Sequence, residues 1–184
     1  STAPSAGAVG VSTNANISVK IDDGVGVVSN MIVVRVQSAR AFSNGAFVGS
    51  YTGAVIRTNA TAFRITVDSP TPFGSSTSIA ASASARDAAG NSISTNWAFT
   101  TADVTAPVVG GFSPSSGSVL ATNDVISFDV TDNVSVATST IRVRLATNLV
   151  TNTVYSNGAG KNGYASSMSG IPGGVRIWID RLSP

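Results

Sequence analysis

The chain of 184 residues contains no cysteine, no histidine and no glutamate. Without cysteine it has no disulfide and no thiolate metal site, although this absence leaves the cellular compartment open. Without histidine and cysteine, the ordinary general base near neutral pH and the Ser-His and Cys-His nucleophiles are excluded. Every acidic residue is an aspartate, so any catalytic or metal-binding chemistry would have to use Asp side chains.

Charge and long apolar runs are also scarce. Only 11% of the residues are charged, the formal net charge is +2, and the basic residues are scattered along the chain. We therefore expect no nucleic-acid partner. Apolar runs such as Met31–Val34 are far too short to cross a bilayer, so we expect no membrane insertion. The abundant small and β-branched residues, mixed with Ser, Thr, Asn and Gly, favour short strands joined by polar turns.

The chain repeats itself. Residues 13–23 return as residues 122–132, with apolar residues at the same alternate positions. Further matches join 32–36 to 141–145, 42–46 to 155–159 and 63–68 to 175–180. A repeat of this length indicates an array of whole small domains. We predict one domain over residues 1–102, a short linker over 103–107 that is stiffened by Pro107, and a second domain over 108–184.

Alternating apolar residues predict the strands of the first domain. They lie at Ile17–Ile21, Ile32–Val36, Phe63–Val67, Ile79–Ala85 and Trp97–Phe99, with a shorter strand from Ala46 to Tyr51. Six or seven short strands in about 100 residues indicate a β-sandwich. Residues 73–101 have no counterpart in the second copy, so the second domain is predicted to lack its last strands.

Three motifs carry a resemblance to a known family. They are the opening strand Thr13–Val19, the turn Ala85–Asn91, and the closing strand Trp97–Thr101 with the linker that follows it. Together they resemble the bacterial Ig-like domains found in tandem in surface-layer proteins, large adhesins and phage virion proteins. The middle of the first copy, from Asn44-Gly45 to Asp68, resembles a variant in phage fibre and capsid-associated proteins.

The resemblance implies an all-β fold of two tandem Ig-like β-sandwich modules, the second lacking its last strands. It also implies a place in a virion or on a cell surface, with other copies or other structural proteins of the assembly as partners. A sandwich of this kind serves many purposes, so the role has to be argued from specific residues.

Catalysis by aspartate pairs is the first chemistry to weigh. A glycosidase-like carboxylate pair would have to come from Asp22 with Asp23, or from Asp129 with Asp132. Adjacent residues of a strand point to opposite faces, and the alternation around Asp129 predicts that it faces solvent. We therefore expect no enzyme.

Calcium is the one cofactor that the residues suggest. Asp103 in the linker, Asp132 and Asn133 after a strand of the second module, and Asp87 in the first module could converge at the module junction. Carboxylate and amide oxygens on flexible loops are the ligands that calcium takes. The simpler interpretation is that these turn residues hydrogen-bond to their own backbone.

Aromatic side chains could stack on the sugar rings of a surface glycan. Tyr51 and Phe42 recur as Tyr164 and Tyr155, which favours a shared packing role. Trp178 replaces Thr66 of the first copy and is predicted to point away from the core. It is therefore the aromatic residue that we expect to contact a ligand or partner.

Three functions are consistent with these observations. The leading hypothesis is a structural spacer of a phage virion protein (a fibre, tail or capsid decoration). The second is the stalk of a bacterial surface-layer protein or adhesin, with or without calcium. The third is an accessory carbohydrate-binding module of a secreted hydrolase. The incomplete second module predicts either a segment of a longer chain or strands donated by another chain.

Overall fold

The computed structural model describes residues 1–119, 121, 124–146 and 150–181, which form two compact units. Unit 1 is Ser1–Val104 and unit 2 is Thr105–Pro184. The regular structure is almost entirely antiparallel strand, which confirms the all-β prediction. Within the described residues the helices are two short 3-10 turns, and neither has the length or apolar character needed to span a membrane.

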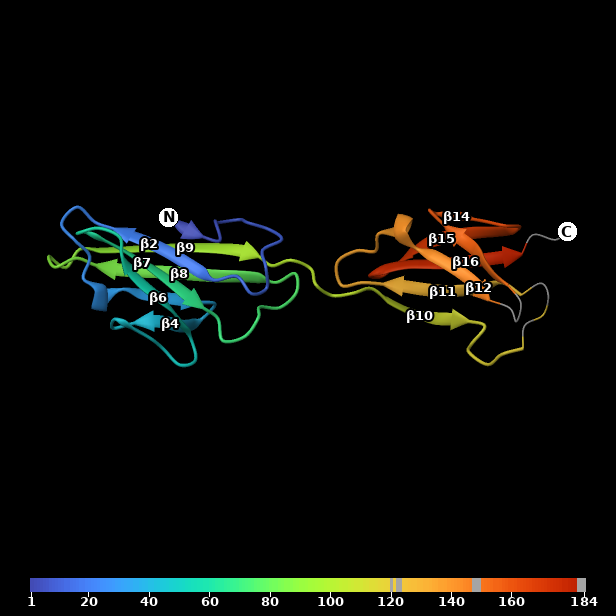
Figure 1. Cartoon of the computed structure of the whole chain (residues 1–184), viewed down its shortest axis with the longest axis horizontal. Coiled ribbons are helices and arrows are strands. Elements are labelled where there is room, and N and C mark those ends of the chain that lie inside the picture. The colour runs from blue at the N-terminus through green and yellow to red at the C-terminus, as the bar shows by residue number, and fades with distance from the viewer. Residues whose placement is uncertain (120, 122–123, 147–149, 182–184) are drawn as a thin grey trace. The chain divides into compact units, whose positions relative to one another are not determined.

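Unit 1 is built from two sheets, with strand orders β1-β2-β7-β6 and β5-β4-β3-β8-β9. In Figure 1, β8 and β9 run side by side in green. The first sheet consists of β1 (Thr2–Ala3), β2 (Ile17–Asp22), β6 (Thr52–Arg57) and β7 (Ala62–Asp68). The second consists of β3 (Val33–Val36), β4 (Ala39–Ser43), β5 (Ala46–Phe47), β8 (Ser78–Arg86) and β9 (Ser92–Thr100), with the 3-10 turn η1 (Ser29–Met31) before β3.

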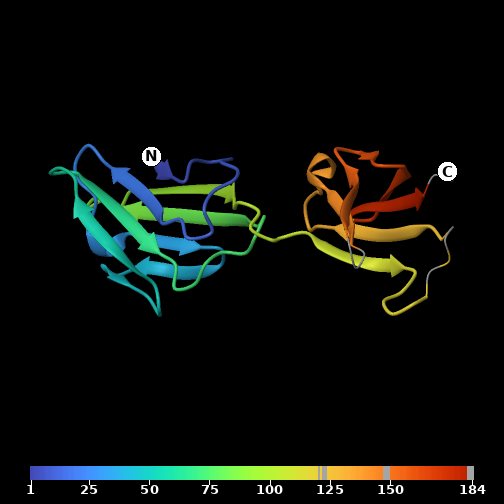
Figure 2. The same cartoon turned by 45° about the vertical axis from the view of Figure 1, so that its right-hand side comes forward.

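Unit 2 is also built from two sheets, with strand orders β10-β11-β16-β15 and β12-β13-β14. Figure 2 shows β10 beside β11 in yellow and orange. The first sheet consists of β10 (Val108–Ser113), β11 (Ile126–Thr131), β15 (Tyr164–Ile171) and β16 (Gly174–Arg181). The second consists of β12 (Arg142–Ala146), β13 (Thr151–Ser156) and β14 (Ala159–Gly160), with the 3-10 turn η2 (Thr138–Thr140) before β12.

The two units share strand order and register. Ile17 of β2 pairs with Val67 of β7, and its repeat partner Ile126 of β11 pairs with Ile179 of β16. The β3–β4 ladder shifts register between Val34 and Arg35, and the β12–β13 ladder shifts between Val143 and Arg144. Because a β-bulge at the same position re-aims the strand in the same way, β12 is the structural equivalent of β3.

Local sequence explains the shared hairpin of each unit. Asn44 and Gly45, between β4 and β5, have φ angles of 52° and 77°, and Asn157 and Gly158 repeat these values as 51° and 77°. Two consecutive residues with positive φ form the two-residue turn that matches the twist of a β-hairpin, and Asn-Gly is its preferred sequence. The repeated Asn-Gly therefore fixes the same hairpin twice.

The last two strands of unit 1 have no counterpart in the described part of unit 2. Their absence changes the core. Unit 1 buries a cluster of sixteen apolar residues, of which β8 and β9 supply six, whereas the described residues of unit 2 form a cluster of six. Ile32, Val34 and Val36 are at most 2% exposed, while their counterparts Ile141, Val143 and Leu145 are only partly buried.

The predicted strand from Ala46 to Tyr51 is wrong. β5 ends at Phe47, and the chain turns before β6 begins at Thr52. The turn is closed by a hydrogen bond from the Tyr51 N–H to the Val48 carbonyl. All six residues of β6 are exposed, so this strand has no apolar alternation by which the sequence could reveal it.

Candidate functional site

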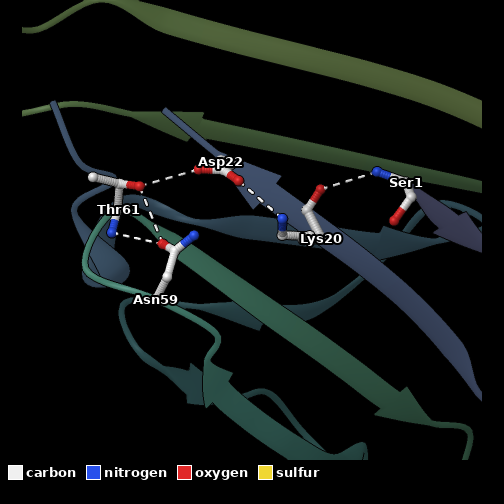
Figure 3. A network of polar contacts seen from close by, with 5 residues as sticks. All are labelled: Ser1, Lys20, Asp22, Asn59 and Thr61. Carbon is white, nitrogen blue, oxygen red and sulfur yellow. Dashed lines mark hydrogen bonds and ion pairs between the residues drawn. The ribbon is translucent and has the colours of Figure 1, made fainter. Parts of the chain in front are cut away.

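Asp22 lies at the end of β2 in a network of polar side chains (Figure 3). Its carboxylate accepts a hydrogen bond from Lys20 Nζ at 2.9 Å and another from Thr61 Oγ1 at 3.2 Å. Asn59 Oδ1 in turn accepts from the Thr61 N–H at 2.8 Å. The Lys20 ammonium lowers the pKa of Asp22, because its hydrogen bond and charge favour the ionised carboxylate. A general acid near neutral pH needs a raised pKa, and that of Asp22 is lowered.

Asp23 and its repeat partner Asp132 perform the same local task. Asp23 Oδ1 accepts hydrogen bonds from the Val25 and Gly26 N–H groups at 2.8 and 3.0 Å. Asp132 Oδ1 accepts the equivalent pair, from Val134 and Ser135, at the same distances. An Asp side chain that bonds to backbone N–H groups two and three residues ahead closes a turn.

Asp129 lies on the outward face of β11, as its alternation with the buried Phe128 and Val130 predicts, but its carboxylate is engaged by another side chain. It pairs across the strands with Arg176, whose Nε and Nη2 donate to the two carboxylate oxygens at 2.6 and 2.8 Å. The Asp129 side chain is only 19% exposed. The Arg176 guanidinium holds the pKa of Asp129 below its usual value, and the carboxylate raises the pKa of Arg176. The carboxylate is occupied by a bidentate ion pair.

The residues predicted to bind calcium lie in turns. Asp87 is almost buried and accepts from the Asn91 backbone N–H at 2.8 Å and from the Asn91 side-chain amide at 2.7 Å. The Asn91 amide lowers the pKa of Asp87. Asp103 accepts from Ser75 Oγ at 2.9 Å, and the same Ser75 Oγ accepts from the Val104 N–H. These bonds tie down the β8–β9 turn and the end of unit 1.

Asp87 and Asp103 belong to unit 1, whereas Asp132 and the exposed Asn133 belong to unit 2. Over the residues that the structure describes, no group of three or more acidic side chains comes together. The calcium site at the junction stays a prediction.

Trp178 lies on the outward face of β16, between Ser127 of β11 and Ser167 of β15. Its neighbours Ile177 and Ile179 are buried, while Trp178 is half-buried and lines an open hollow on the surface. The hollow is lined by Val125, Ala165, Ser166, Ser167, Trp178 and Asp180. The equivalent residue of unit 1, Thr66, instead bonds to Ser18 Oγ at 3.3 Å.

Other predicted aromatic residues pack in the cores. Tyr155 is fully buried, Trp97 is 6% exposed, and Tyr51 and Tyr164 pack at the margins of their clusters. This confirms the packing interpretation of the recurring aromatic positions. Trp178 is the exception among the residues that were weighed for sugar contact.

Sequence reasoning missed the Asp129–Arg176 pair, although a signal for it was present. In the repeat, Lys20 matches Asp129 and Arg64 matches Arg176. The structure pairs Lys20 with Arg64 and Asp129 with Arg176 at the same place in the sheet. Unit 1 therefore has two like charges where unit 2 has an ion pair, and Lys20 turns to Asp22 instead.

A comparison with protein families matches residues 1–101 to the bacterial Ig-like domain. The match covers nearly all of unit 1, including both of its sheets. No curated protein matches the chain.

Proposed function

We propose that this chain, which belongs to the bacterial Ig-like domain family, is a non-enzymatic structural module of an extracellular assembly. The observation that carries the proposal is how the aspartates are used. Asp22, Asp87 and Asp129 have their pKa values lowered by Lys20, Asn91 and Arg176, and Asp23 and Asp132 close turns. These carboxylates stabilise the fold, and such use supports a scaffold more than a reactive site.

The second part of the proposal is that unit 2 is a further Ig-like module in tandem with the first. It rests on the shared strand order, the shared bulge and the repeated Asn-Gly hairpin. Tandem sandwiches hold a functional part at a distance from its support, and the short segment around Pro107 suits such a spacer.

We further propose that the assembly is a phage virion, in which the chain serves as part of a fibre, tail or capsid decoration. The resemblance of residues 44–68 to a variant in phage fibre and capsid-associated proteins supports this choice. Antibodies against unit 1 should label purified virions by immunogold electron microscopy, at positions that repeat around a symmetric particle. Labelling of the bacterial surface and not of virions would instead establish a surface-layer or adhesin stalk.

The hypothesis that the chain is an adhesin stalk stiffened by calcium has a test of its own. A calcium-stiffened stalk should lose several degrees of melting temperature in excess chelator and recover them on adding calcium. The Asp103→Asn variant should then abolish the calcium response, because it removes a proposed ligand charge. An unchanged melting temperature in chelator would contradict calcium binding by this protein.

A second candidate function is glycan binding at the Trp178 hollow. The specific observation is that Trp178 lines the hollow together with Ser167, which lies opposite it on β15, and Asp180, which lies two residues along β16 on the same face. An apolar ring face with a few convergent polar groups is the chemistry that binds a sugar ring. Retention on a glycan array should be lost in Trp178→Ala and largely kept in Trp178→Phe, which preserves a ring. Equal retention by Trp178→Ala would place any binding elsewhere.

A further inference from the structure

The outer edge of β6 in unit 1 is the feature that the proposed function leaves unexplained. β7 pairs with one edge of β6, and among the described residues no strand pairs with the other (Figure 1). All six residues of β6 are exposed, including Val55 at 42% and Ile56 at 51%. Proteins usually protect such an edge with lysine, proline or a β-bulge. β6 contains neither lysine nor proline, and its ladder with β7 runs from Thr52 to Arg57 without a register shift.

The hydrogen bonds beside β6 show which of its backbone groups face outward. Just past the strand, the Thr58 N–H donates to the Ala62 carbonyl at 2.9 Å, so these two residues form a hydrogen-bonded pair. Such pairs alternate with non-hydrogen-bonded pairs along an antiparallel ladder. The N–H and C=O groups of residues 52, 54 and 56 therefore point to β7. Those of Gly53, Val55 and Arg57 point to the outer edge.

The sequence of β6 is complementary to itself in one antiparallel register. In this register Val55 of one copy lies opposite Val55 of another, and the outward backbone groups of the two strands bond to each other. Gly53 then lies opposite Arg57, and Ala54 lies opposite Ile56. Each small residue therefore meets a large one, so the two strands fill the space between them from residue 53 to residue 57.

The other registers that use the same backbone groups fit less well. A register centred on Arg57 places two arginines directly opposite each other, and like charges in that position are destabilising. A register centred on Gly53 carries Ile56 and Arg57 past the start of the partner strand at Thr52. In the register centred on Val55 the arginine meets only a glycine. Its guanidinium donates to the Asn59 and Ala60 carbonyls at 3.2 and 2.6 Å, which holds the charge beside its own turn.

The equivalent edge strand of unit 2 lacks this pattern. Val55 of β6 pairs with Ile65, and Met168 of β15 pairs with the repeat partner Ile177, so Met168 occupies the position of Val55. The residues around Met168 at positions 166, 167 and 169 are all serine. Where β6 alternates small and large apolar residues, β15 is small and polar. The self-complementary pattern therefore belongs to unit 1 and does not come from the shared fold.

We propose that two copies of this chain associate through β6, in the antiparallel register that places Val55 opposite Val55. The pairing joins the β1-β2-β7-β6 sheets of the two copies into one continuous sheet. It covers Val55 and Ile56 of both copies and gives partners to the outward backbone groups. The occupant is a second copy, because β6 itself supplies the sizes and the charge that its own edge accommodates.

Sedimentation velocity of the full chain tests the association. The natural chain should contain a dimer whose share grows with protein concentration. Val55→Lys should lose the dimer, because the register brings the two lysines directly opposite each other. Met168→Lys is the matched control, since it puts the same charge at the equivalent place of β15, and it should associate as the natural chain does.

Val55→Pro separates backbone pairing from side-chain contact. Proline is tolerated on an edge strand where its N–H side faces solvent, so unit 1 should remain folded. The variant keeps an apolar side chain but removes the N–H that bonds to the Val55 carbonyl of the second copy. The dimer should therefore be lost again. Amide hydrogen exchange in β2 and β3 reports whether unit 1 is folded in each variant.

Disulfide formation tests the register, because the chain has no cysteine of its own. Two Val55→Cys chains would place their cysteines in a hydrogen-bonded pair with Cα atoms about 5.5 Å apart, which suits a disulfide. Two Ala54→Cys chains would place theirs diagonally, about 7 to 8 Å apart, which is too far. In oxidised glutathione, Val55→Cys should form the linked dimer on the order of tenfold or more faster than Ala54→Cys, because its thiols are held together.

Each measurement has an outcome that would overturn the proposal. A natural chain that sediments as a monomer at every concentration would show that β6 does not pair. A dimer that persists in both Val55→Lys and Val55→Pro would place the contact elsewhere, and so would loss of the dimer in Met168→Lys. Equal rates of disulfide formation in the two cysteine variants would contradict the register. These outcomes do not depend on whether the protein is found in a virion.

Discussion

Unit 1 and unit 2 share the same local turns and bulge, but they differ in how fully their core residues are buried. The Asn-Gly hairpin, the Asp turn after the first long strand, and the bulge in the β3 or β12 strand recur in both. Among the residues that the structure describes, β8 and β9 have no counterpart in unit 2. Ile32, Val34 and Val36 are enclosed in unit 1, whereas their counterparts in unit 2 are only partly buried. The comparison shows that the same local structure occurs at different degrees of core burial.

The largest expected effect comes from truncating the same side chain in both units. Ile32→Ala should lower the free energy of unfolding of unit 1 by about 2 to 5 kcal/mol, because it opens a cavity in a closed core. Ile141→Ala should cost unit 2 about 1 to 2 kcal/mol, because this side chain is only partly buried. Denaturant-dependent hydrogen exchange with mass spectrometry separates the two units. Equal losses would mean that Ile141 is enclosed as fully as Ile32.

The loss of stability in acid should differ between the two units, because their charged side chains are paired differently. Arg176 lowers the folded-state pKa of Asp129, so this pair stabilises unit 2 above the unfolded-state pKa of about 3.9. The stabilisation is lost as the pH falls through the lower folded-state value. Asp129→Asn should therefore flatten the acid dependence of unit 2 and leave that of unit 1 unchanged. Hydrogen exchange measures the stability of each unit from about pH 5 down to the pH at which the unit unfolds. This range includes the unfolded-state pKa of Asp129.

Lys20→Gln is the matched control, because Lys20 occupies the position of Asp129 in unit 1 and bonds to Asp22. It should alter the acid response of unit 1 alone. An acid midpoint of unit 2 that is the same with and without the Asp129 carboxylate would contradict the assigned role of the ion pair.

The Asp turns should respond equally in the two units. Asp23→Ala and Asp132→Ala each remove an acceptor of two backbone N–H groups with the same distances. Each should cost its own unit about 1 kcal/mol, because exposed hydrogen bonds contribute modestly. Urea denaturation, followed separately in each unit, measures the two losses of stability. A loss in one unit only would show that the repeated turn does not have a repeated energetic role.

The smallest effect is expected for Trp178→Thr, which installs the residue that unit 1 has at this place. The outward position predicts a change in the stability of unit 2 of less than about 0.5 kcal/mol. Thermal unfolding measures it. A loss above 1 kcal/mol, on the same scale of surface substitutions, would make Trp178 a packing residue and weaken the case for the hollow as a binding site.

Much of the fold followed from the sequence because apolar residues alternate where one sheet face is buried. The alternation of Ile17, Val19 and Ile21 identified β2. The sequence did not predict β6, because all of its residues are exposed. Its place is set by pairing with β7 and not by its own residue pattern. The candidate site was less predictable. The partner of Asp129 depends on the β11–β16 register, which joins residues 47 positions apart.

By itself, the sequence determined the all-β class, the repeat and the two Asn-Gly hairpins, because these depend on local pattern. The tertiary structure decided what each charge does and which edges are closed. Lys20 and Asp129 occupy equivalent positions, but each lies opposite an arginine, so that one belongs to a like-charge cross-strand pair and the other to an ion pair. Whether β3 or β12 is enclosed likewise depends on a strand from elsewhere in the chain, since strand pairing joins segments that are distant in sequence.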